Sequence, residues 1–257
     1  MALVYDALPL IFPKPAIIRP ATDDLLRYGK DPVVAALLAH RLRRVVGAPT
    51  VAFLQHAESI ATTSTFTFSA QNVGTAAGNR KIIAAISYDI LATTSLTSIT
   101  AAASSMTIVA EYENTNVGNI RSHIALAIID LPTGTTADFV VTLGSNALGC
   151  HLSLYRVVDL LSSTPTDTAT AGSVEDPSTT IDVPAGGFAV AIATDPETGS
   201  TTWVGLATED YDATDANTWT YSGAHESFAS AQTGMTVTAN FSFADNRGAL
   251  AVAAWGN

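Results

Sequence analysis

MTVTANFSF, residues 235–243, alternates apolar and polar side chains without interruption. The apolar positions are Met235, Val237, Ala239, Phe241 and Phe243. A period of two residues is typical of a β-strand with one buried face. STFTFS (64–69) and SMTIVAEYE (105–113) alternate in the same way. The sequence therefore predicts a half-buried strand in each of these segments.

Four other segments are apolar almost throughout, which is expected of strands with both faces buried. They are KIIAAIS (81–87), HIALAIID (123–130), FAVAIA (188–193) and ALAVAAW (249–255). Turn clusters separate about twelve predicted strands, and no amphipathic segment of helical length lies between them. We therefore expect a mainly β protein, an antiparallel, jelly-roll-like β-sandwich preceded by an extended N-terminal arm and one α-helix.

A polar stretch, residues 162–180, interrupts the strand pattern. It divides two subdomains or forms one long loop across a single sandwich. Residues 181–257 offer only about five or six strands, and the apolar strands at both ends of the body need each other as cover. We therefore favour a single sandwich.

Residues 1–50 lack the alternating strand pattern of the rest of the chain. Closely spaced prolines at positions 9, 13, 15 and 20 favour an extended apolar arm. A helix is predicted over residues 31–47, with Asp31 as N-cap, Pro32 at the first helical position and Gly47 as stop. The residues expected to anchor this segment on a partner are Phe12, Ile17, Ile18, Leu37, Leu38 and Leu42.

The charge distribution changes at the same place. Residues 1–50 hold seven of the 12 Lys and Arg residues against four acids, and residues 51–257 hold five against nineteen. A basic arm before an acidic β body indicates an attachment segment, residues 1–50, joined to a displayed domain, residues 51–257. The acidic body argues against a nucleic-acid partner, because phosphates would be repelled.

The composition bears on assembly and location. The chain has 43 alanines, only 7% aromatic and 14% charged residues, and no apolar run long enough to span a membrane. A body with so few charged groups is expected to bury surface against identical copies, as a homotrimer. Cys150 is the only cysteine, which fits synthesis in a reducing compartment and excludes a disulfide within the chain.

The histidines give no pattern of metal ligands. His40, His56, His123, His151 and His225 are widely spaced. His123 and His151 fall within strand patterns and would be able to face each other, but a structural role is favoured for both. The nucleophile elbow and the phosphate-binding loop are absent from the sequence. We therefore expect no catalytic residues, no metal and no cofactor.

Acidic residues offer two weaker alternatives. EDYDATDAN (209–217) has a spacing that suits Ca²⁺, but it lacks the EF-hand glycine and terminal glutamate, so a solvated loop is favoured. A carboxylate pair for glycoside hydrolysis would come from Glu111, Glu113, Asp210 and Asp212. The sequence does not single out a pair, and Glu111 with Glu113 is more typical of a solvent-facing row.

Four aromatic residues are the candidate binding surface of the body. Trp203, Tyr211, Trp219 and Tyr221 lie among acids and amides, as in a platform on which sugar rings stack. The competing interpretation places these rings in the sandwich core or at a subunit interface, and it is favoured.

Turn motifs carry a resemblance to a known class of protein. A glycine turn precedes an arginine-led strand in NVGTAAGNRKIIAAISYD (72–89), and a Leu-Pro-Thr-Gly turn interrupts IALAIIDLPTGTTADFVVTL (124–143). A Pro-x-Gly-Gly turn opens a strand in IDVPAGGFAVAIAT (181–194), and TTWVGLATEDYD (201–212) completes the set. Together these segments resemble β-sandwich proteins of phage and prophage structural genes.

The resemblance implies a bacteriophage virion structural protein of capsid decoration, tail fibre or tail accessory type, assembled in the host cytoplasm. Its partners would be other virion proteins. We expect a non-enzymatic protein. The alternatives are a carbohydrate-binding adhesin module that recognises a host surface glycan and, less favoured, a polysaccharide-degrading enzyme.

Overall fold

The computed structural model describes residues 47–257 apart from residues 91–94, 115–120, 217–218 and 244–246. The chain divides into two units, residues 1–45 and 46–257. The predicted arm, its six anchoring residues and His40 lie outside the described residues, as does the predicted helix up to Val46.

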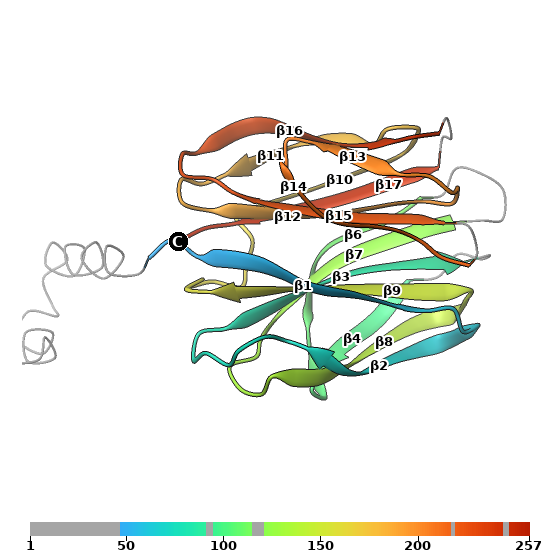
Figure 1. The fold of residues 1–257 in the computed structure, drawn as a ribbon, viewed down its shortest axis with the longest axis horizontal. Helices are drawn as coiled ribbons and strands as arrows, with labels where there is room; N and C mark the ends of the chain where they lie inside the picture. The colour runs from blue at the N-terminus through green and yellow to red at the C-terminus, as the bar shows by residue number, and fades with distance from the viewer. Residues whose placement is uncertain (1–46, 91–94, 115–120, 217–218, 244–246) are drawn as a thin grey trace, which may run out of the picture. The chain divides into compact units, whose positions relative to one another are not determined.

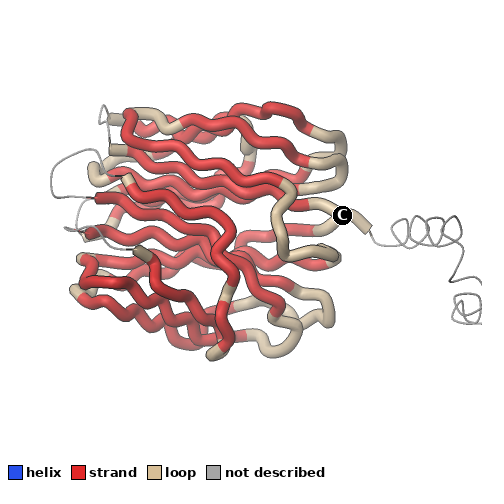
Figure 2. Tube along the Cα trace, turned by 180° about the vertical axis from the view of Figure 1, so that it is seen from behind, coloured by secondary structure: helices blue, strands red, loops and turns tan. Residues whose placement is uncertain are grey.

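The described body consists of seventeen strands in four antiparallel sheets, and no helix occurs in it (Figures 1 and 2). Sheet A has the order β1-β9-β3-β7-β6, sheet B β2-β8-β4-β5, sheet C β10-β17-β12-β15-β14 and sheet D β11-β16-β13. The strands are β1 (Thr50–Ser59), β2 (Thr63–Asn72), β3 (Lys81–Ile90), β4 (Leu96–Ala101), β5 (Ser104–Ser105), β6 (Thr107–Glu113), β7 (Arg121–Asp130), β8 (Thr136–Ala147), β9 (Gly149–Val158), β10 (Asp167–Val174), β11 (Ser178–Val183), β12 (Phe188–Asp195), β13 (Thr201–Val204), β14 (Thr208–Thr214), β15 (Thr220–Ser227), β16 (Gln232–Phe241) and β17 (Gly248–Trp255).

Three hydrophobic cores join the sheets into a stack of four layers in the order B, A, C, D (Figure 1). The first core packs Phe66 of sheet B with Ile82 of sheet A. The second packs Ile83 of sheet A with Phe188 and Trp255 of sheet C, and the third packs sheet C against sheet D. Sheets A and C are therefore covered on both faces, whereas sheets B and D have one open face.

Position in this stack explains the two kinds of strand pattern. Every residue of β12 and β17 is buried, and so is β3 from Lys81 to Asp89. In the outer strand β2, Phe66 and Phe68 are buried while the threonines beside them are exposed. The predictions of doubly buried strands and of half-buried alternating strands are confirmed.

The stack consists of two halves with the same strand order. In the first half, β1 pairs with β9 and β9 with β3, while β2 lies in the opposite sheet. In the second half, β10 pairs with β17 and β17 with β12, while β11 lies in the opposite sheet. The short β5 has no counterpart in the second half. The expectation of a single two-sheet sandwich is therefore wrong. The polar stretch that suggested a crossing loop contains two regular strands, β10 and β11, whose threonine-rich sequence hides their periodicity.

Arg80 fixes two of the connections between sheets A and B. Its side chain is 1% exposed and donates hydrogen bonds only to backbone carbonyls. Nη1 contacts the carbonyls of Val73 and Gly74 in the β2–β3 turn, as well as Gly134 O. Nε and Nη2 donate to the carbonyls of residues 131 and 133 in the β7–β8 turn, both at 2.6 Å. Gly74 and Gly134 have φ of 72° and 74°, which favours glycine there. One buried side chain thus holds the glycine turn and the Leu-Pro-Thr-Gly turn together.

We expect Arg80→Lys to lower the free energy of unfolding by about 3 kcal/mol, because an ammonium cannot reach five carbonyls and each unsatisfied buried acceptor costs about 1–3 kcal/mol. Arg156→Lys is the matched control, because the Arg156 side chain donates to a single backbone carbonyl, that of Thr75. Urea unfolding measures both variants. Equal midpoints for the two variants would contradict this role of Arg80.

Candidate functional site

Polar side chains are buried mainly at the end of the stack where β3 ends and β17 begins. They include Asp89, Asp215, His123, His151 and Thr220. Burying polar groups costs free energy unless they find partners, so such a concentration requires specific contacts. This end of the stack is therefore the first candidate for a functional site.

The polar cluster is densest in a seam between sheets A and C. Strands β1 and β9 form one edge of sheet A, and β14 and β15 form the facing edge of sheet C. The ring of Tyr211 on β14 stacks on Phe53 and His56 of β1, with ring centroids 5.6 and 4.6 Å apart. The ring of Tyr221 on β15 stacks on His151 of β9 at 3.5 Å. We call this region the β1–β15 seam.

A β-bulge in β1 decides which side chains enter the seam. The pairing of β1 with β9 shifts by one residue between Phe53 and Gln55. Phe53 packs in the A–C core and Leu54 against the A–B core. Beyond the bulge, His56 and Glu58 pair with Ser153 and His151 and lie on the same face as Phe53. Without the extra residue, both would point toward sheet B.

Both histidines of the seam have polar groups close to their ring nitrogens. His56 Nδ1 lies 2.9 Å from Ser153 Oγ, and His56 Nε2 lies 3.3 Å from His151 Nδ1. On its other side, His151 Nε2 lies 3.5 Å from a carboxylate oxygen of Asp215, the residue that follows β14. Burial, together with nearby His151, lowers the pKa of His56 to about 4, so this imidazole is neutral at neutral pH.

Asp89 links the two central sheets at the inner end of the seam. It lies on β3 of sheet A and accepts a hydrogen bond of 2.5 Å from the Tyr221 hydroxyl of sheet C. Burial raises the pKa of the Asp89 carboxyl well above its usual range; the Tyr221 hydrogen bond opposes this and nearby Asp215 adds to it. Asp89 is thus a carboxyl that favours its protonated form.

The predicted aromatic platform is not assembled on the surface. Trp219 and Tyr221 are 4% and 0% exposed, so neither ring can stack on a sugar without rearrangement. Trp203 is partly buried and donates from Nε1 to Ser222 Oγ at 2.9 Å. Tyr211 lies within the seam. The four residues therefore do not form one exposed aromatic surface.

The acidic segment 209–217 forms mostly strand β14, so the predicted solvated loop is wrong. Pairing with β15 makes this segment a strand, and two of its acids have fixed partners on β15 and β13. Asp210 accepts from His225 at 2.7 Å, and Asp212 accepts from the Thr201 amide at 3.0 Å. None of these contacts forms a Ca²⁺ cage.

His123 and His151 do not face each other, contrary to the possibility raised by the sequence. His151 points into the seam, whereas His123 lies on the opposite face of sheet A beside Tyr88 and 3.1 Å from Glu111. Glu113 pairs with Arg121 at 2.9 Å. The carboxylates of β6 are thus committed to separate ion pairs and do not form a row free in solvent.

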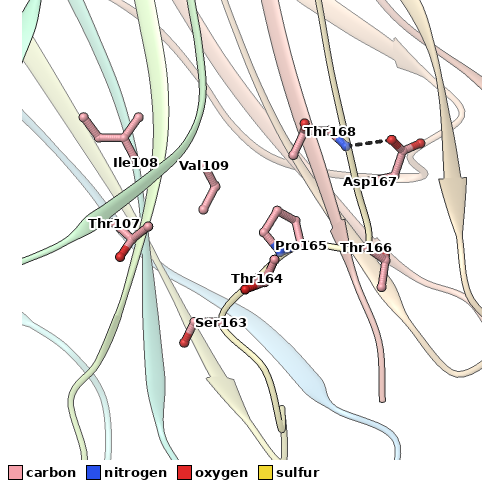
Figure 3. A pocket seen from close by; sticks show the side chains of 9 residues that line it. All are labelled: Thr107, Ile108, Val109, Ser163, Thr164, Pro165, Thr166, Asp167 and Thr168. Atoms are coloured by element: carbon pink, nitrogen blue, oxygen red, sulfur yellow. Dashed lines mark hydrogen bonds between the residues drawn. The ribbon is translucent and has the colours of Figure 1, made fainter.

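A groove of about 520 Å³ lies at the other edge of the A–C interface (Figure 3). It is lined by β6 and by the connection from β9 to β10. Its one charged residue, Asp167, accepts hydrogen bonds from the amides of Thr168 and Asp182. The lining offers neither a nucleophile with a base nor a set of metal ligands, so the β1–β15 seam is the stronger candidate.

Comparison with protein-family models, with curated proteins and with solved structures found no match.

Trp219→Ala is expected to lower the free energy of unfolding by about 3–5 kcal/mol, because it leaves a cavity in a buried site. Trp203→Ala is the matched control and should cost less than half as much, since Trp203 is partly exposed. Thermal unfolding, together with glycan-array binding, measures both. Lost glycan binding at an unchanged melting temperature for Trp219→Ala would make this residue part of a recognition site.

Stability should fall with rising pH because of Asp89. Its raised pKa means that the folded chain keeps a proton that the unfolded chain releases above about pH 4. The free energy of unfolding therefore declines from about pH 4 up to the folded-state pKa. Asp89→Asn should remove this contribution, and Tyr221→Phe should enlarge it by removing the hydrogen bond that lowers the pKa.

Urea unfolding of wild type and both variants, measured at several pH values between about 4.5 and 8, tests this prediction. The difference in free energy between wild type and Asp89→Asn should shift in favour of the variant as pH rises. A difference that does not change with pH would show that Asp89 is charged in the folded protein.

Proposed function

We propose that this chain is a non-enzymatic structural component of a bacteriophage virion, of decoration, fibre or tail accessory type. Residues 1–50 attach it to other virion proteins, and the β body is displayed. The observation that carries the proposal is the division of the chain after residue 45, which coincides with the change from a basic to an acidic composition. All three cores described for the body use residues that follow this division.

Each half of the body is proposed to be a jelly roll. The order β1-β9-β3-β7 opposite β2-β8-β4, repeated in β10-β17-β12-β15 opposite β11-β16-β13, supports this assignment. Jelly rolls are common in capsid proteins and in lectins. Burial of Trp219 and Tyr221 favours the capsid alternative over a lectin that uses these rings, because rings that stack on a sugar must be exposed.

The turns held by Arg80 also support the proposal. The glycine turn and the Leu-Pro-Thr-Gly turn, two motifs on which the resemblance to phage structural proteins depends, converge on this one side chain. Their spacing in the sequence thus has a common physical cause, since both connections must present carbonyls to the same guanidinium.

Deleting residues 1–46 should abolish incorporation into the particle while leaving a folded β body, because the described cores do not use those residues. Circular dichroism, light scattering and binding to purified particles measure the outcome. The full-length protein is expected to be a homotrimer. A truncated chain that is unfolded, or that still joins the particle, would contradict the anchoring role.

Two point variants sharpen this experiment. Leu37→Asp should weaken incorporation more than Arg43→Ala, because placing a charge on an apolar contact surface costs several kcal/mol, whereas a terminal arginine contributes about 0.3–1 kcal/mol. The reverse order would indicate an electrostatic anchor. If the full-length protein binds no virion particle but binds a polysaccharide, the adhesin alternative is favoured. If it degrades the polysaccharide, the enzyme alternative is favoured.

A further inference from the structure

The bulge in β1 brings together three metal-ligating side chains that are distant in the sequence. His56 and Glu58 lie on β1 and His151 on β9, and one ligand atom from each lies within 4.8 Å of the others. Glu58 is exposed, His56 is partly buried and His151 is buried. The group thus has a fixed inner side and one side open to solvent.

The spacing of the two imidazoles suits one metal ion between them. Zn²⁺ binds histidine nitrogen at about 2.0–2.1 Å in tetrahedral geometry, which places two ligand nitrogens about 3.3–3.4 Å apart. The separation of His56 Nε2 and His151 Nδ1 is 3.3 Å. A carboxylate oxygen from Glu58 would supply a third ligand, and water the fourth.

A polar side chain lies beside the second nitrogen of each ring, where metal-bound histidines usually have a partner. The Asp215 carboxylate near His151 Nε2 favours the tautomer with the proton there, which leaves a lone pair on Nδ1. Ser153 Oγ at 2.9 Å can accept the proton of His56 Nδ1, which leaves a lone pair on Nε2. The two nitrogens that then carry lone pairs, His56 Nε2 and His151 Nδ1, lie 3.3 Å apart.

We propose that His56, Glu58 and His151 form a binding site for a divalent transition metal, with Zn²⁺ the expected ion. The two imidazoles and single carboxylate favour Zn²⁺ over Ca²⁺ or Mg²⁺, which prefer sites made of oxygen atoms. Bound metal joins β1 to β9 within sheet A. Through Asp215, it also supports the β1–β15 seam between the two halves of the body.

The test uses the full-length, tag-free chain, stripped with a chelator and titrated with Zn²⁺ by calorimetry. Wild type should bind one Zn²⁺ in the seam and gain thermal stability, because the metal binds the folded state. Loss of an outer-shell partner typically costs about 10–100-fold in metal affinity. Asp215→Asn should fall in this range, and His56→Gln should lose more.

Glu58→Gln keeps the test independent of folding, because Glu58 is exposed. It should weaken Zn²⁺ binding at least about 10-fold with an unchanged circular dichroism spectrum. His225→Gln is the matched control, since His225 pairs with Asp210 outside the group of three and should leave the affinity unchanged. Co²⁺ in place of Zn²⁺ should give the strong visible absorption of a tetrahedral ion.

Either of two results overturns the proposal. One is absence of Zn²⁺ binding by wild type at about 100 µM free metal, a concentration that fills about 99% of a site whose Kd is about 1 µM. The other is an affinity that stays the same in His56→Gln or in Glu58→Gln.

Discussion

Burial of both faces of sheets A and C is the constraint on which the rest of this structure depends. Two sheets that are covered on each side need almost every side chain to be apolar and small enough to fit between neighbouring layers. Both faces of β17 are buried, with Ala249, Ala251 and Ala253 toward sheet A and Leu250, Val252 and Ala254 toward sheet D. The low aromatic and charged content of the chain follows from this architecture.

The same constraint explains where polar chemistry is possible. A charged or hydrogen-bonding side chain inside the stack must bring its own partners, and it does so where the central strands end. Arg80 serves the turns at one end. At the other end, Asp89 and His151 of sheet A meet Tyr221 and Asp215 of the sheet C side across the A–C interface. The seam is thus a polar connection between two otherwise apolar sheet faces.

Much of the fold is predictable from periodicity, because the buried faces of a strand appear directly in its sequence. β3, β12 and β17 are recognisable as doubly buried and β16 as half-buried. Strands rich in threonine and serine, such as β10 and β11, bury few large apolar side chains and therefore show no clear apolar periodicity. For this reason the sequence predicts one sandwich where the structure has two pairs of sheets.

The site was much less predictable. A bulge changes the phase of a strand by one residue, and the sequence TVAFLQHAES of β1 gives no sign of where this happens. His56 and His151 are 95 positions apart and meet only through the β1–β9 pairing. A signal was present in the pattern of His56 and Glu58, two potential ligands two residues apart on one face of a strand, but their partner required the sheet topology.

Hydrogen exchange followed by mass spectrometry tests the four-layer arrangement most directly. The four-layer arrangement predicts the slowest exchange in β3, β12 and β17, because their amides become exposed to solvent only when both covering layers are lost. Strands β2 and β16 of the outer sheets should exchange faster. Faster exchange in β12 and β17 than in β16 would contradict the placement of sheet C at the centre of the stack.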